Sequence, residues 1–187
     1  MLNKIQNKSS LNWLVKPQPG HLVQFYQSHS GLIKQLSDFI GSGLEEGDNC
    51  IVLADHAHAQ SLREQLYMSG LNLSAAQRSG QYIVLDAAET LSRFMVAGMP
   101  NRRLFYEVIG TLVKELSSND RPIRAYGEMV AVLWKLGNKA AVLKLEELWN
   151  ELAETYNFAL FCAYPQLHFI MDRSVPEEIR AFHNVSL

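Results

Sequence analysis

The chain has 187 residues, of which 48% are hydrophobic and 19% are charged, with a formal net charge of −2 at pH 7. This composition is that of an ordinary globular protein and excludes disordered and fibrous classes. An isoelectric point near 6.3 gives no basic field for nucleic acid, so we expect no nucleic-acid binding by this chain alone.

The N-terminal 20 residues carry lysines but no continuous apolar segment, which argues against a secretory signal and predicts a cytoplasmic protein. No apolar stretch elsewhere approaches the roughly 20 residues that a bilayer requires, so we predict no membrane contact. The first segment ends in Lys16-Pro17-Gln18-Pro19-Gly20, where the prolines and the glycine disfavour helix. We therefore predict a flexible arm over residues 1–20, followed by one domain over 21–187.

From residue 21 onward, short apolar segments alternate with longer segments of helical periodicity. The predicted strands cover 21–26, 50–54, 82–85, 122–126 and 158–164, and the predicted helices 32–44, 58–69, 87–95, 105–116 and 141–156. Gly47 is the expected stop of the first helix. Strands without charges are typical of sheets covered on both faces, so the order predicts an α/β fold with a mostly parallel sheet. Near the C-terminus, 168–171 is a candidate edge strand and 176–183 a candidate short helix.

The expected ligand site lies where the strands end, because ligands of open α/β sheets bind at the carboxyl ends of the strands. These ends supply aromatic, sulfur-bearing and polar side chains, a mixture that is typical of a small-molecule pocket. We predict that the ligand-binding residues are Tyr26, His29, Arg124, Tyr126, Glu128, Met129 and Tyr164.

Several polar residues allow a functional and a structural interpretation. Asp55 precedes a predicted helix, and the histidines that follow it lack the i, i+4 spacing of metal ligands on one helix face, so we predict an N-cap and no metal site. Glu128 can be a general base or a partner of Arg124, and it can equally be a paired structural carboxylate. Both interpretations stay open.

Other conspicuous side chains are expected to be structural. Cys50 and Cys162 lie within predicted strands, where a free cysteine behaves as a small hydrophobic residue. Trp134 and Trp149 are predicted core residues, because large aromatic side chains dominate core burial. Four acidic residues flank the apolar stripe of the last long helix and are expected to form its solvated face: Glu146, Glu147, Glu151 and Glu154.

The motifs of common enzymes are absent from the sequence. A phosphate-binding loop requires Gly-x-x-x-x-Gly-Lys-Ser/Thr, but residues 25–34 read Phe-Tyr-Gln-Ser-His-Ser-Gly-Leu-Ile-Lys. No Gly-x-Ser-x-Gly elbow, His-Glu-x-x-His helix or dinucleotide fingerprint occurs either. We therefore predict no catalytic residue, no cofactor and no self-sufficient enzyme.

Several strings of residues resemble the MEDS domain, the sensory domain named for methanogens, methylotrophs and the dichloromethane regulator. The resemblance extends from His21 to His183, nearly the whole chain. The strings that carry it are His21 with Phe25-Tyr26, Gly43-Leu44-Glu45-Glu46-Gly47, Arg124-Ala125-Tyr126-Gly127-Glu128-Met129-Val130, Leu133-Trp134, Asn138-Lys139-Ala140-Ala141, Leu145-Glu146-Glu147-Leu148-Trp149-Asn150 and Cys162-Ala163-Tyr164-Pro165.

The resemblance implies a fold and a role. The family looks related to RecA- and KaiC-type ATPases, which implies a three-layer α/β/α, P-loop NTPase-like fold with a degenerate phosphate loop and Glu128 near the place of the magnesium-binding acid. Its members usually accompany histidine-kinase or DNA-binding modules and are thought to sense small molecules. This sequence carries neither module, so the output would pass through a partner chain or through residues 1–20.

Three hypotheses follow. The leading one is a regulatory domain in which a small, largely apolar molecule shifts the surface offered to a signalling partner such as a histidine kinase. The second is retained nucleotide binding, in which Lys34, Arg124 and Glu128 replace the missing loop. The third is a ligand-free interaction module that uses helix 139–156 or the tail 175–187. The sequence is also compatible with a homodimer.

Overall fold

The computed structural model describes residues 14–166, 179, 181–183 and 185–186. The candidate strand at 168–171 and half of the candidate helix at 176–183 lie outside these residues. None of the described helices is both long and apolar enough to cross a bilayer.

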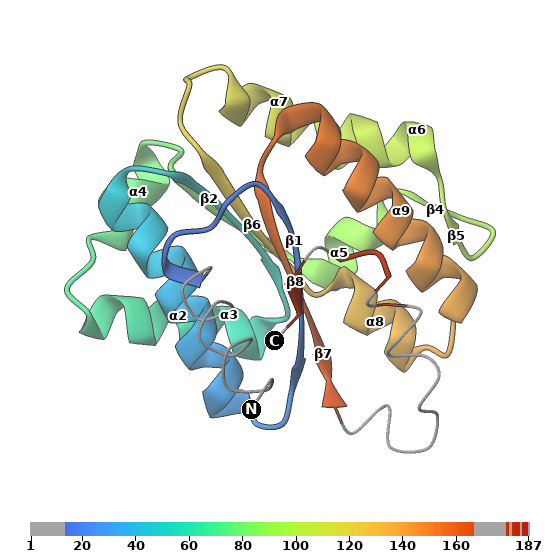
Figure 1. Ribbon diagram of the computed structural model, residues 1–187, viewed down its shortest axis with the longest axis horizontal. Coiled ribbons are helices and arrows are strands. Elements are labelled where there is room, and N and C mark those ends of the chain that lie inside the picture. Colours follow the sequence, from blue (N-terminus) through green and yellow to red (C-terminus); the bar gives the residue numbers. More distant parts are fainter. Residues whose placement is uncertain (1–13, 167–178, 180, 184, 187) are drawn as a thin grey trace.

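A six-stranded parallel sheet forms the centre of the molecule (Figure 1). Its strands follow the order β3-β2-β6-β7-β1-β8, and each neighbouring pair is parallel. This confirms the α/β fold with a mostly parallel sheet. The strands are β1 (Gly20–Tyr26), β2 (Asn49–Ala54), β3 (Tyr82–Asp86), β6 (Ile123–Gly127), β7 (Ala159–Pro165) and β8 (Val185–Ser186).

Helices cover both faces of the sheet and complete three layers (Figure 1). One face packs against α2 (His29–Glu46), α3 (His56–Met68) and α4 (Leu73–Arg78). The other face packs against α5 (Ala87–Ser92), α6 (Arg102–Phe105), the π-helical turn η1 (Tyr106–Gly110), α7 (Thr111–Ser117), α8 (Met129–Lys135) and α9 (Lys139–Tyr156). A small hairpin of β4 (Met95–Val96) and β5 (Met99–Pro100) lies outside the main sheet.

The strands carry apolar side chains on both faces, because each face of the sheet is covered by helices. In β7, Phe161 belongs to the core under α2, whereas Leu160 and Cys162 belong to the core under α9. This two-sided burial is typical of central parallel strands. Because both faces are buried, these strands lack charged residues, and their uncharged segments in the sequence predicted them correctly.

Local signals set the ends of the helices that flank the sheet. Ser28 caps α2, since its side chain accepts from the Gly31 amide, and Gly47 ends that helix with a φ of 89°. The expected glycine stop is thus confirmed. Asp55 caps α3 by accepting from the His58 amide, as predicted, so this helix begins at His56 rather than at His58.

Candidate functional site

The candidate site lies between β2 and β6, neighbouring strands whose following helices leave in opposite directions. α3, after β2, packs in the core under α2, whereas α8, after β6, packs in the core under α9. In open α/β sheets, ligands bind at the carboxyl edge beside such a switch point. Glu128 stands directly before α8, and Asp55 directly before α3.

The Glu128 carboxylate is the centre of the site and is only 5% exposed. Its Oε2 accepts from the Asp55 amide at 2.8 Å, and its Oε1 accepts from the Tyr126 hydroxyl at 2.6 Å. His58 Nδ1 lies 2.6 Å from the same Oε1 and 3.5 Å from Asp55 Oδ2. One buried carboxylate therefore joins β6, the start of α3 and the end of β2.

Aromatic rings surround this carboxylate. The rings of Tyr26 and His58 are 6.1 Å apart at a right angle, and His29 stacks on His58 at 4.9 Å. His29 Nε2 also lies 3.0 Å from the hydroxyl of Ser61, which ties α2 to α3. Burial and then the charges of Glu128 and Asp55 raise the pKa of Tyr26 to about 12, so this phenol stays protonated at neutral pH.

The structure brings together four of the seven residues predicted to line one crevice, namely Tyr26, His29, Tyr126 and Glu128. Arg124 does not lie at the predicted site. It is near the start of β6, and its guanidinium contacts α2. Its guanidinium pairs with Glu46 and Asp48, each at 2.7 Å, and not with Glu128. The suggested Arg124–Glu128 pair is therefore wrong, and Glu128 pairs with His58 instead.

Met129 and Tyr164 also lie away from the side chains that surround the Glu128 carboxylate. Met129 is 0% exposed and belongs to the core under α8. Tyr164 points to the opposite face of the sheet, where its hydroxyl donates to Glu146 of α9. Glu146 itself is 0% exposed, so its assignment to a solvated helix face is wrong. The prediction that Trp149 is a core residue is confirmed, because it is 1% exposed.

Sequence reasoning missed the role of His58. Asp55, His58 and Glu128 offer three donor atoms within 4.8 Å of one another, so this set can in principle approach a metal ion. However, both oxygens of Glu128 already accept from the protein, and a cation would have to displace His58. The arrangement is better suited to a charged hydrogen-bonding site than to a metal centre.

Stability is expected to depend on pH through His58. Contact with Glu128 raises the His58 pKa above 6.5, and the Asp55 charge acts in the same direction, against the opposing effect of burial. Tyr26 and His29 face the other side of the ring. A histidine pKa that is raised on folding adds stability below about pH 6.5, and that stability is lost as pH rises through the folded-state pKa.

Urea unfolding between about pH 6 and about pH 9 tests this expectation. The free-energy difference between wild type and His58→Gln should shrink as pH rises, and comparing the two proteins cancels other titrating groups. His56→Gln is the matched control, because His56 is an exposed histidine in the first turn of the same helix. A His58→Gln difference that stays constant over this range would contradict the assignment.

Comparisons with known proteins add two findings. The family model described as the methanogen/methylotroph, DcmR sensory domain (MEDS) matches residues 20–184. In structure, the chain is similar to the crystal structure of a KaiC-like protein from the hyperthermophilic archaeon Pyrococcus horikoshii OT3, with a TM-score of 0.55 and 16% identity. That match covers 80% of this chain and 65% of the archaeal chain, and it confirms the RecA-like fold. No curated protein matches the chain.

Proposed function

The chain belongs to the MEDS family of sensory domains, and on this premise we propose that it is a non-catalytic regulatory domain for a small ligand. The ligand binds at the carboxyl edge of the sheet, beside Glu128 and His58. Its binding alters the surface that the domain offers to a signalling protein, such as a histidine kinase or a transcription regulator. The observation that carries the proposal is the buried His58–Glu128 pair at the switch point of the sheet.

The connection between β1 and α2 supports a ligand other than a triphosphate. In P-loop proteins a long glycine-rich loop at this kind of position wraps the phosphates with backbone amides. Here only Gln27 and Ser28 separate the strand from the helix, and Ser28 already accepts from the Gly31 amide at 3.2 Å. The short connection leaves little backbone for a phosphate chain.

Helix α3 supports a route for the signal. His58 lies in its first turn against Glu128, and the hydroxyl of Ser61 contacts α2 through His29. At the other end of the same helix, Tyr67 and Met68 are 74% and 81% exposed, which gives a partner an apolar surface to contact. A ligand that binds better to one arrangement of the His58–Glu128 pair would shift the position of α3, as signalling requires.

Isothermal titration calorimetry tests the proposal with a panel of small, largely apolar molecules that each carry one polar group. We expect at least one compound to bind the wild-type chain, and Glu128→Gln to weaken that binding by about 10-fold or more, because a hydrogen bond to a charged group is lost. Glu147→Gln is the matched control, since Glu147 is an exposed glutamate on α9 that pairs with Lys144.

Three outcomes would count against the proposal. A chain that binds none of the compounds would argue against ligand sensing and favour a pure interaction module. Magnesium-dependent binding of ATP that Glu128→Gln abolishes would favour retained nucleotide binding instead. Equal losses in Glu128→Gln and Glu147→Gln would place the ligand away from the switch point.

A further inference from the structure

A second polar cluster lies between the sheet and α9, near the start of β1. His21 of β1, Glu146 of α9, Cys162 of β7 and His183 before β8 each bring one donor atom to within 4.8 Å of the others. The side chains of Glu146 and His183 are 0% exposed, and that of His21 is 1% exposed. Nitrogen, oxygen and sulfur ligands from four separate elements therefore meet in a buried place.

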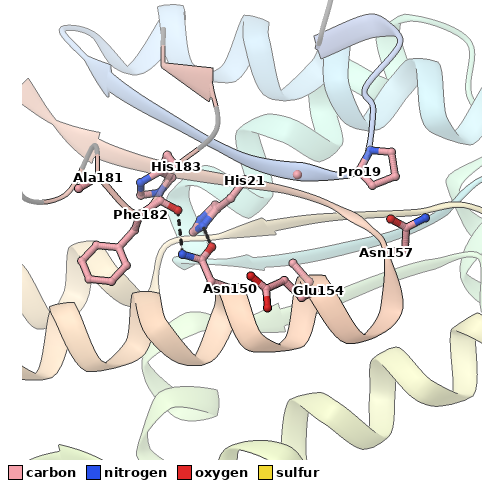
Figure 2. A pocket seen from close by; sticks show the side chains of 10 residues that line it. Pro19, His21, Asn150, Glu154, Asn157, Ala181, Phe182 and His183 are labelled. Carbon is pink, nitrogen blue, oxygen red and sulfur yellow. Dashed lines mark hydrogen bonds between the residues drawn. The ribbon is translucent and has the colours of Figure 1, made fainter.

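Hydrogen bonds orient both histidine rings toward this cluster. Asn150 donates from Nδ2 to the Phe182 carbonyl, so its Oδ1 faces His21 Nδ1 at 2.8 Å as an acceptor (Figure 2). Because Nδ1 of His21 then carries the proton, Nε2 carries the lone pair. His183 is oriented in the same way, since the Ile179 carbonyl accepts from its Nδ1 at 2.7 Å. Metal-binding histidines are held by acceptors in this manner.

Two of the separations between donor atoms fit a tetrahedral metal site. Glu146 Oε2 lies 3.5 Å from His21 Nε2 and 3.6 Å from His183 Nε2, longer than the usual N–O hydrogen bond of about 2.7 to 3.2 Å. Around Zn²⁺, bonds of about 2.0 to 2.3 Å place neighbouring ligands about 3.3 to 3.8 Å apart. His21 Nε2 and Cys162 Sγ lie 3.1 Å apart, where the thiol donates a hydrogen bond to the imidazole, and this pair is closer than the zinc range. Glu146 Oε2 makes no hydrogen bond to a described residue.

The charges of the cluster also suit a divalent cation. One thiolate and one carboxylate balance one divalent cation, and their two protons leave when it binds.

A cavity provides an entry path to the cluster. It has a volume of about 350 Å³ and lies between the start of β1 and the C-terminal half of α9 (Figure 2). His21, Asn150 and His183 line it together with Phe182. The rings of His21 and His183 lie 3.8 Å apart at the bottom of this opening.

We propose that His21, Glu146, Cys162 and His183 form a structural Zn²⁺ site. Four protein ligands leave no open position for a substrate, which separates this site from catalytic zinc centres. The ion would fasten the segment around His183 to β1, β7 and α9. The site lies on the opposite face of the sheet from the His58–Glu128 pair, so it does not depend on the proposed ligand sensing.

Titration of the metal-free full chain with Co²⁺, followed by absorption, tests the site. A tetrahedral site with one thiolate gives strong visible bands and a sulfur-to-cobalt charge-transfer band, which we expect to saturate at one equivalent and to disappear when Zn²⁺ is added. Cys162→Ser should remove the charge-transfer band and weaken Zn²⁺ binding by more than about 100-fold, because a direct ligand is lost. Asn150→Ala should weaken binding by about 10- to 100-fold.

Cys50→Ser is the matched control, because Cys50 is the other buried cysteine and lies in the core on the other face of the sheet. This variant should keep both the band and the affinity. A wild-type chain without the band, or a band that Cys50→Ser removes and Cys162→Ser keeps, would overturn the proposal. If Cys162→Ser does not fold, the wild-type and Cys50→Ser spectra still decide, since the chain has only two cysteines.

Discussion

Replacing Arg124 by alanine is expected to lower the free energy of unfolding by about 3 to 5 kcal/mol. Arg124 is 1% exposed, and its Nε and one terminal nitrogen pair with Asp48 and Glu46, each at 2.7 Å. The guanidinium also donates to the Phe39 carbonyl at 3.0 Å. The alanine variant would leave the Asp48 carboxylate, only 9% exposed, without its positive partner. Such an uncompensated charge is the main cost.

Arg102→Ala is the matched control for this experiment. Arg102 also forms an ion pair, with Glu151 at 2.9 Å, but its side chain is 64% exposed and solvent screens the interaction. Urea unfolding of the two variants should therefore show a large loss for Arg124→Ala and a much smaller one for Arg102→Ala. Similar losses would mean that burial does not decide the strength of these ion pairs.

The same arginine explains a string of residues that the family resemblance singled out. Gly43 lies where α2 crosses Arg124, and a Cβ atom at this position would lie 2.7 Å from Arg124 Nε. Glu46 and Asp48 follow at the end of the helix and provide the two carboxylates. The Gly43–Gly47 string therefore has a structural role. Gly43 leaves room for the buried guanidinium, and Glu46 provides one of its two carboxylate partners.

The fold could be predicted from the sequence because its strong signals are local. Uncharged strands, helical stripes and the stop at Gly47 each depend on residues close together in the chain. The short elements were missed for the same reason. Helices α4 and α8 have six and seven residues, and β4 and β5 have two residues each, which is too few to show a period. The apolar string that became α8 matched both a strand and a helix.

The site could be predicted only in part, because its contacts depend on which strands are neighbours. The alternation of strands and helices along the chain does not predict that β2 pairs with β6. This pairing is what brings His58 to Glu128. Arg124 and Tyr126 share one face of β6, because side chains two residues apart in a strand point the same way. Arg124 lies near the start of the strand, however, and only Tyr126, near its end, reaches Glu128.

Glu146 shows where a general rule about charged residues misled the sequence reasoning. Glutamate is rarely buried in proteins, so its place beside the apolar stripe of α9 suggested a solvated face. The buried side of α9 is wider than that stripe and includes Leu145, Glu146 and Trp149. A fully buried carboxylate needs partners, and here these come from β1, β7 and the segment before β8, which no local pattern could indicate.

Replacing Trp149 by alanine is expected to lower the free energy of unfolding by about 3 to 5 kcal/mol, the usual cost of removing a large buried aromatic ring. The Trp149 side chain is 1% exposed and contacts the rings of Phe105 and Phe158 at 5.4 and 6.4 Å. The alanine variant would leave a cavity between α9 and the sheet, next to the strand end that positions Glu128. Chemical denaturation measures the loss.

Trp149→Phe separates the ring contacts from the indole N–H. Nε1 of Trp149 has no acceptor among the described residues, so phenylalanine would keep most of the packing and lose no hydrogen bond. We expect this variant to retain more than half of the stability that alanine loses. A Cβ on Gly127 would lie 3.8 Å from the Trp149 ring, so that ring supports the residue directly before Glu128. If phenylalanine were as damaging as alanine, stability would depend on the packing of the full indole ring rather than on a six-membered ring at this place.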